Sequence, residues 1–159
     1  MSNCDWLPDL EYFEDYHNDW KTYEAAIYKI FRDDLINKRL LYKNMRVFVR
    51  RYPIIDGREE AFWHVTCKDY NGTGDREPDF RRFERIRWIR AFIINYENVK
   101  VWTEPYHNRS RIHLLLDEEK YMVILEKRKN YYLLITAFYL DYDHALKEQL
   151  KHYDEYKDK

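Results

Sequence analysis

Four extended apolar runs in the second half of the chain constrain its fold most strongly. They cover residues 99–103, 111–116, 121–125 and 131–139. Only short polar links, at 117–120 and 126–130, separate the last three runs. Links of this length join antiparallel neighbours, because a parallel connection has to cross back over the sheet. We therefore expect a mainly antiparallel four-stranded meander.

The first half of the chain combines helical and extended patterns. Apolar residues recur at spacings of three and four over residues 20–37, which predicts an amphipathic helix. Strands are expected next at 45–51 and 60–67, with turn chemistry at Asp56-Gly57 between them. A flexible loop that contains two of the three glycines is expected at 71–75.

Two more helices complete the expected fold. Asp79 is a suitable N-cap for a central arginine-rich helix, and the C-terminal helix covers about 142–156. We expect a single α+β domain over residues 1–159. N-terminal helices and the arginine-rich helix would pack on the meander, and an acidic lead over residues 1–19 would precede them.

Composition excludes several classes of protein. The chain has 159 residues, of which 45% are hydrophobic, as in a compact domain rather than a disordered one. Its apolar runs are shorter than the roughly 20 residues of a membrane span, and its start lacks the pattern of a signal peptide. We expect a cytoplasmic protein with no membrane partner. Cys4 and Cys67 are too few for a zinc ribbon or a disulfide framework, so neither a metal nor a cofactor is expected.

Charge is segregated along the chain although the net charge is only -1. Carboxylates dominate residues 1–19, and arginines crowd a short stretch in mid-chain: Arg76, Arg81, Arg82, Arg85, Arg87 and Arg90. We interpret the arginines as a basic face for a phosphate backbone. The acidic lead would then lie near that face or repel RNA from the rest of the surface. The alternative is a solvated acidic tail, with the arginines paired to Glu77, Asp79 and Glu84.

His64 lies in an aromatic segment shortly before the arginines. Imidazole titrates near neutrality, and guanidinium groups bind phosphate oxygens in bidentate fashion. Together they are what metal-free RNA cleavage requires. The alternative is a half-buried histidine that is bonded to a backbone carbonyl.

Four motifs in combination resemble the phage-associated branch of the BECR nucleases, the superfamily of barnase, EndoU, the tRNA-cleaving colicins and RelE. The motifs are residues 59–64, 78–88, 100–102 and 130–138, and the likeness extends from about Arg46 to Tyr156. The resemblance implies metal-independent endoribonuclease chemistry, commonly in toxins. It also implies RNA as substrate and an antitoxin or immunity protein as a possible partner.

Carried over residue by residue, the resemblance implies a catalytic set of His64, Arg82, Glu84, Arg85 and Thr136. The 2′-hydroxyl of the RNA would attack the phosphate and leave a 2′,3′-cyclic phosphate. His64 would carry the proton, Arg82 and Arg85 would hold the phosphate from one helix face, and Thr136 would donate a hydrogen bond to it. Glu84 would orient an arginine or act as the second proton carrier.

Further RNA contacts are expected from residues outside the catalytic set. Arg81 extends the basic helix, and Arg109 and Arg111 lie in a second basic tract between His107 and His113. Alternation along the last strand places Tyr132 on the same face as Thr136 and leaves Tyr131 to the core. The competing interpretation is a non-catalytic RNA-binding or protein-interaction module on the same fold.

Overall fold

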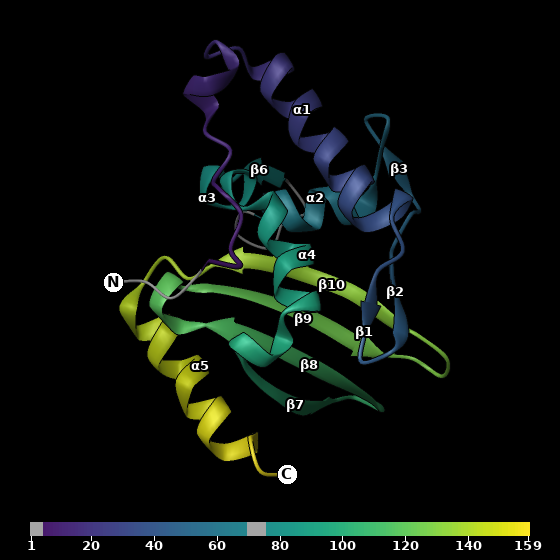
Figure 1. Ribbon diagram of the computed structural model, residues 1–159, viewed down its shortest axis with the longest axis vertical. Coiled ribbons are helices and arrows are strands. Elements are labelled where there is room, and N and C mark those ends of the chain that lie inside the picture. The colour runs from purple at the N-terminus through teal and green to yellow at the C-terminus, as the bar shows by residue number, and fades with distance from the viewer. Residues whose placement is uncertain (1–4, 70–75) are drawn as a thin grey trace.

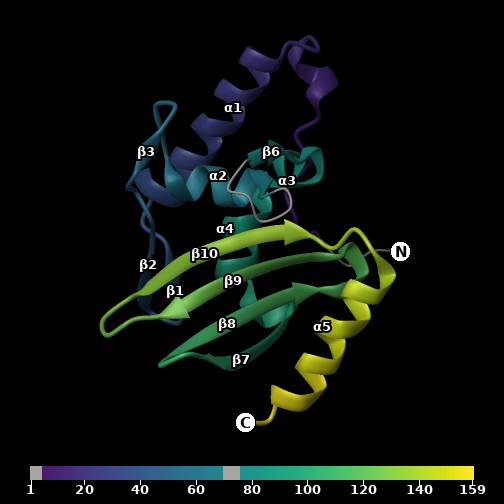
Figure 2. The same ribbon diagram turned by 180° about the vertical axis from the view of Figure 1, so that it is seen from behind.

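The computed structural model describes residues 5–69 and 76–159 and shows an α+β fold (Figure 1). One curled sheet carries α1–α4 on one side, which we call the inner face, and α5 on the other, the outer face (Figures 1 and 2). The predicted α+β class is confirmed. The loop expected at 71–75 lies outside the described residues.

The main sheet has six strands in the order β1-β2-β10-β9-β8-β7. Their bounds are Leu41–Tyr42 (β1), Met45–Val49 (β2), Lys100–Tyr106 (β7), Arg109–Leu116 (β8), Tyr121–Lys127 (β9) and Tyr132–Tyr139 (β10). The sheet has two strands more than the four predicted, because β2 pairs in parallel with the edge of β10, with Val47 opposite Tyr132, and β1 pairs with β2. Val47 and Val49 are buried while Phe48 is exposed, so β2 has the alternation of a strand with one face on the core.

Smaller elements connect the sheet to the helices. Two short hairpins are formed by Ile54–Ile55 (β3) with Arg58–Glu59 (β4), and by Cys67–Asp69 (β5) with Arg76–Pro78 (β6). The helices are Trp20–Arg32 (α1), Glu60–Thr66 (α2), Phe80–Glu84 (α3), Ile86–Ile94 (α4) and Asp143–Tyr156 (α5). A π-helical segment, Asp33–Asn37, continues α1 to the predicted end of that helix.

Capping residues explain where two of these helices begin. The carboxylate of Asp19 accepts a hydrogen bond from the Thr22 backbone N–H at the start of α1. Asp79 accepts one from the Arg81 backbone N–H at the start of α3, as its sequence position predicted. The arginine-rich segment nevertheless breaks at Arg85, which leaves the helical region with a ψ angle of 20° and separates α3 from α4.

The strand predicted over residues 60–67 is wrong, because residues 60–66 form α2. Ala61, Phe62 and Val65 are buried on one side of this helix, and the Phe62 ring packs edge-on against Phe31 at 5.4 Å. The aromatic and β-branched residues of the segment favour a strand only weakly, and packing against α1 outweighs that preference.

A β-bulge changes the facing of residues along β10. Leu134 lies opposite Leu125 and Thr136 lies opposite Ile124, so Ile135 is an additional residue in the strand. Tyr132 and Leu134 belong to the main core, as does Ala137 rather than Thr136. The prediction that Tyr132 and Thr136 share a face is therefore wrong. Tyr131 is not in the core either, since its half-buried ring packs on exposed Phe48.

Two cores flank the sheet. The main one joins the inner face to α1, α2 and α4, and a smaller one under α5 contains Trp102, Leu115 and Met122. The acidic lead packs on the main fold. The Trp88 indole donates a hydrogen bond to the Pro8 carbonyl oxygen, and the Glu11 backbone N–H donates one to the Glu84 carbonyl oxygen. The described part of the lead is thus packed, not a solvated tail. In the described chain, we find no helix with the length and apolarity needed to cross a membrane.

Candidate active site

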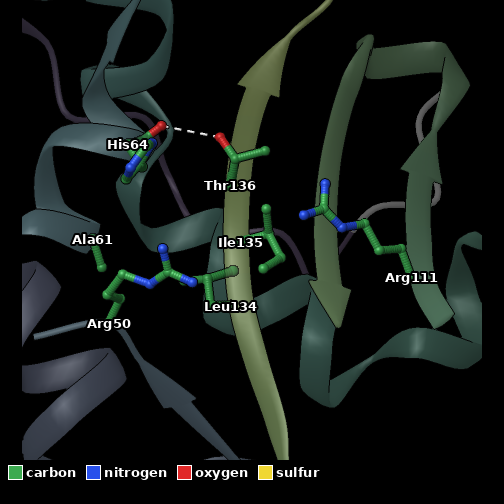
Figure 3. A pocket seen from close by; sticks show the side chains of 7 residues that line it. All are labelled: Arg50, Ala61, His64, Arg111, Leu134, Ile135 and Thr136. Carbon is green, nitrogen blue, oxygen red and sulfur yellow. Dashed lines mark hydrogen bonds between the residues drawn. The ribbon is translucent and has the colours of Figure 1, made fainter. Parts of the chain in front are cut away.

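A pocket of about 360 Å³ lies between α2 and the bulged part of β10 (Figure 3). Its lining comes from β10, from α2, from β8 and from the residue that follows β2: Arg50, Ala61, His64, Arg111, Leu134, Ile135 and Thr136. His64, Thr136 and Arg111, three of the residues proposed from the sequence, therefore meet at one place. The pocket combines an imidazole, two guanidinium groups and apolar walls.

His64 occupies the last turn of α2, one helical turn after Glu60. Its Nε2 atom lies 2.9 Å from Glu60 Oε1, and the Arg76 Nη2 atom is 3.5 Å from the same nitrogen. The carboxylate is the nearer partner and fixes the orientation of the ring, as an acidic residue does for the histidine of a catalytic triad. The imidazole remains 38% exposed. Within residues 5–69 and 76–159, Nδ1 is the ring nitrogen of His64 that has no hydrogen bond.

Arg111 on β8 and Arg50, directly after β2, extend their guanidinium groups toward the pocket (Figure 3). Arg111 Nε lies 3.2 Å from Glu126 Oε1, and its guanidinium stacks 3.5 Å from the centre of the Tyr106 ring. Arg50 is exposed, and within residues 5–69 and 76–159 its side chain has no hydrogen bond or ion pair. An unpaired guanidinium beside a paired one favours an anion between them.

Thr136 positions the main chain of His64. Its Oγ1 donates a hydrogen bond to the His64 carbonyl oxygen at 3.0 Å, which joins α2 to β10 beyond the point where β2 pairing ends at Leu134. The hydroxyl hydrogen is therefore used inside the protein. This contact differs from the predicted hydrogen bond to a phosphate oxygen and makes Thr136 a positioning residue.

Arg82 is also occupied by the protein itself. Its Nη1 donates to the carbonyl oxygens of Cys67, at 2.6 Å, and His64, at 3.2 Å, and so satisfies two carbonyls at the end of α2. Its Nε lies 3.2 Å from Asp79 Oδ2. Arg82 thus supports the segment that carries His64 and does not line the pocket.

Arg85 and Glu84 form a buried ion pair away from the pocket. Both residues are over nine-tenths buried, and Arg85 Nη1 lies 3.1 Å from Glu84 Oε1 and donates to the Arg81 carbonyl. Arg81 is more exposed and also pairs with Glu84. The predicted joint phosphate site of Arg82 and Arg85 is wrong, because the break at Arg85 ends the helix face that they were expected to share. The alternative interpretation holds for these arginines: Arg82 pairs with Asp79, and Arg81 and Arg85 pair with Glu84.

Tyr132 is not placed as a stacking residue. It is 8% exposed, and its ring packs edge-on against Tyr42 at 5.1 Å. The bulge at Ile135 separates it from Thr136. The ring of Tyr132 is therefore not accessible for the predicted contact with RNA.

Arg109 and Arg111, by contrast, belong to a cluster around Glu126 on the outer face. Glu126 is 3% exposed and forms ion pairs with Arg109, Arg111 and Arg128 at 3.8, 3.2 and 2.6 Å. Burial opposes ionisation of Glu126, but hydrogen bonds from Arg111 and Arg128 outweigh it and lower the pKa of the carboxyl group. One ionised carboxylate faces three guanidinium groups, so the cluster carries excess positive charge.

Several residues of this region were not found from the sequence: Arg50, Glu60, Glu126 and Arg128. Glu60 and His64 have the i, i+4 spacing of one helix face, but that signal is visible only if the segment is interpreted as a helix. Among residues 5–69 and 76–159, no group of three or more His, Cys, Asp or Glu side chains is arranged to hold a metal ion.

Comparison with known proteins gives no match. No protein-family model matches the chain, and neither the curated proteins nor the solved structures contain a significant match to it. The functional argument therefore depends on the sequence motifs and on the geometry of the pocket.

Proposed function

We propose that this protein is a metal-independent endoribonuclease of the BECR type. One observation carries the proposal: the pocket joins an imidazole held by a carboxylate to two guanidinium groups, of which Arg50 has no partner among the described residues. Proton transfer and stabilisation of phosphate charge are the two contributions that metal-free RNA cleavage requires of an enzyme.

In the proposed reaction, His64 removes the proton of the RNA 2′-hydroxyl as its oxygen attacks the adjacent phosphorus. A bond forms between O2′ and phosphorus, and the bond from phosphorus to O5′ breaks. The imidazolium then gives the proton to O5′, which leaves a 2′,3′-cyclic phosphate and a 5′-hydroxyl. Arg50 and Arg111 bind the non-bridging oxygens, where negative charge develops in the transition state.

The positioning residues differ from those proposed from the sequence alone. Glu60 orients the His64 ring, and Thr136 and Arg82 hold the His64 main chain. Arg85 and Glu84 pair with one another and have no assigned role in the reaction. The family likeness further suggests a toxin that acts on cytoplasmic RNA and is neutralised by an antitoxin or immunity protein.

The direct test measures the RNA products. Purified protein should cut RNA in the presence of EDTA and leave 2′,3′-cyclic phosphate ends. His64→Ala should lower the cleavage rate by about 10²-fold or more and change RNA affinity little, since proton transfer contributes mainly in the transition state. His144→Ala is the matched control, because His144 is exposed and belongs to α5.

A folded His64→Ala variant that cuts RNA at the wild-type rate would contradict the mechanism. The arginines around Glu126 favour a second candidate, a non-catalytic RNA-binding module. That function is indicated if the wild-type protein binds RNA and leaves it intact.

A further inference from the structure

The outer face of the sheet is open beside the pocket. At one end, α5 covers Trp102, Leu115 and Met122 in the smaller core. The opposite end carries the β7–β8 and β9–β10 hairpins and is not covered by α5 (Figure 2). Any ligand that enters the pocket therefore extends over this uncovered end or away from the sheet.

Strand register places the relevant side chains in one row across the uncovered end. Phe48 on β2 lies opposite Leu133, Leu133 opposite Glu126, and Glu126 opposite Arg111 on β8. Arg109 and Arg128 join Arg111 around Glu126, and Arg46 stacks over the Phe48 ring with 4.9 Å between guanidinium carbon and ring centre. The row is basic at both ends.

Two exposed aromatic rings accompany these arginines. Phe48 is 43% exposed, and Tyr106, at the end of β7, is 44% exposed. Each has a guanidinium group near its ring, from Arg46 and Arg111 respectively. From β2 to β7 there are four strand spacings in the sheet order, or roughly 19 Å. The two rings thus lie on opposite sides of the Glu126 cluster.

We propose that this arginine–aromatic face, formed by Arg46, Phe48, Tyr106, Arg109, Arg111 and Arg128, binds single-stranded RNA on either side of the cleaved phosphate. The inference rests on the proposed function and adds the substrate class to it. Unpaired bases stack on Phe48 and Tyr106 while the arginines bind phosphates. A duplex keeps its bases stacked within the helix, so it gains the phosphate contacts without the ring contacts. The surface therefore selects single strands.

Binding is tested without cleavage, using wild-type protein and a fluorescently labelled 2′-O-methyl RNA that lacks the attacking hydroxyl. We expect the single strand to bind about tenfold or more tightly than the same RNA in a blunt duplex. Phe48→Leu and Tyr106→Leu should each weaken single-strand binding about tenfold and leave duplex binding largely unchanged. Tyr142→Leu is the control, since Tyr142 is an exposed aromatic residue beside α5.

Equal affinity for duplex and single strand, or wild-type affinity in both ring variants, overturns the inference. Tighter binding of polyglutamate than of RNA, lost in the ring variants, also overturns it and assigns the face to an acidic protein. None of these results depends on cleavage, so the His64 test of the proposed function stands separately. Conversely, ring-dependent single-strand binding without any cleavage supports this face and refutes only the ribonuclease activity.

Discussion

At the scale of single residues, Glu60 holds the imidazole on which the proposed cleavage depends. Its carboxylate contacts Nε2 of His64, and Glu60 itself does not line the pocket. Glu60→Gln keeps the side-chain shape but removes the charge that stabilises an imidazolium. We expect the maximal cleavage rate to fall by at least about tenfold, while the Michaelis constant changes little.

Single-turnover rates at saturating RNA would measure this effect. Glu148→Gln, an exposed change on α5, provides the matched control. An unchanged maximal rate with a raised Michaelis constant would instead place Glu60 in substrate binding.

Arg82 and Arg111 are residues of the same type with different contacts, so their substitution should have different effects. Arg82 donates to carbonyl oxygens at the end of α2, whereas Arg111 lines the pocket. Arg82→Gln should lower the free energy of unfolding by about 1–3 kcal/mol, because buried carbonyls lose a charged donor. Arg111→Gln should instead reduce the slope of log affinity against log salt by about 0.7, the value for one phosphate contact in a single strand.

Urea denaturation and RNA titrations over a series of salt concentrations separate these two outcomes. A reduced salt slope in a stable Arg82→Gln protein would return that arginine to the RNA-binding surface. An unchanged slope in Arg111→Gln would show that this guanidinium serves only to neutralise Glu126.

At the scale of elements, the contact of α5 with the sheet contains a histidine whose side chain is only 12% exposed. His113 stacks on Trp102 at 5.0 Å, and its Nδ1 lies 3.7 Å from Glu104 Oε2. The other oxygen of this carboxylate, Oε1, lies 3.0 Å from His152 Nδ1. Burial lowers the pKa of His113 to about 4, against the opposing charge of Glu104. Between about pH 6.5 and pH 4, His113 is therefore protonated in the unfolded chain but neutral in the folded chain.

The wild-type protein should consequently lose stability as the pH falls from about 6.5 toward 4. His113→Phe removes the titrating group and preserves a ring for Trp102. Between pH 7 and pH 4.5, the variant should lose about 2 kcal/mol less of its unfolding free energy than the wild type. Urea denaturation at both pH values measures the difference. Equal losses in the two proteins would contradict the assignment of this pH dependence to His113.

Local pattern was sufficient to predict most elements. The helix over 20–37, the arginine-rich helix after Asp79, the last four strands and α5 all have periodicity or capping that is encoded within the segment. The segment 60–67 was assigned wrongly, because its helix depends on packing against α1. The bulge at Ile135 was also missed, since a single additional residue does not change the alternation of side chains in the part of the strand that precedes it.

The site was only partly predictable for the same reason. His64 could be singled out as a residue type, but its neighbours Arg50, after β2, and Arg111, on β8, are brought to it only by the tertiary fold. Arg82 and Arg85 had the composition of an anion site. Arg82 instead donates to the Cys67 carbonyl, a partner distant in sequence, and Arg85 pairs with the adjacent Glu84, the alternative that the sequence left open.

At the scale of the whole molecule, local charge outweighs net charge. The protein carries a formal charge of -1, yet four arginines surround the pocket and Glu126: Arg50, Arg109, Arg111 and Arg128. Guanidinium groups stay protonated at any biological pH. The affinity for an uncleavable single-stranded RNA should therefore be nearly constant from pH 7.5 to 9 at fixed salt. A steep loss over this range, measured by fluorescence anisotropy, would show that net charge governs binding.

The parallel pairing of β2 with β10 has a consequence for synthesis of the chain. Val47 pairs opposite Tyr132, so the edge of β2 that faces β10 stays unpaired until the last strand of the sheet has been made. Non-local pairing of this kind folds slowly, and domains fold as units during translation. The pocket likewise takes Arg50 and His64 from the first half and Arg111 and Thr136 from the second. A ribosome that carries a chain still lacking β10 thus holds no assembled pocket, because Thr136 and the other residues that β10 contributes are missing.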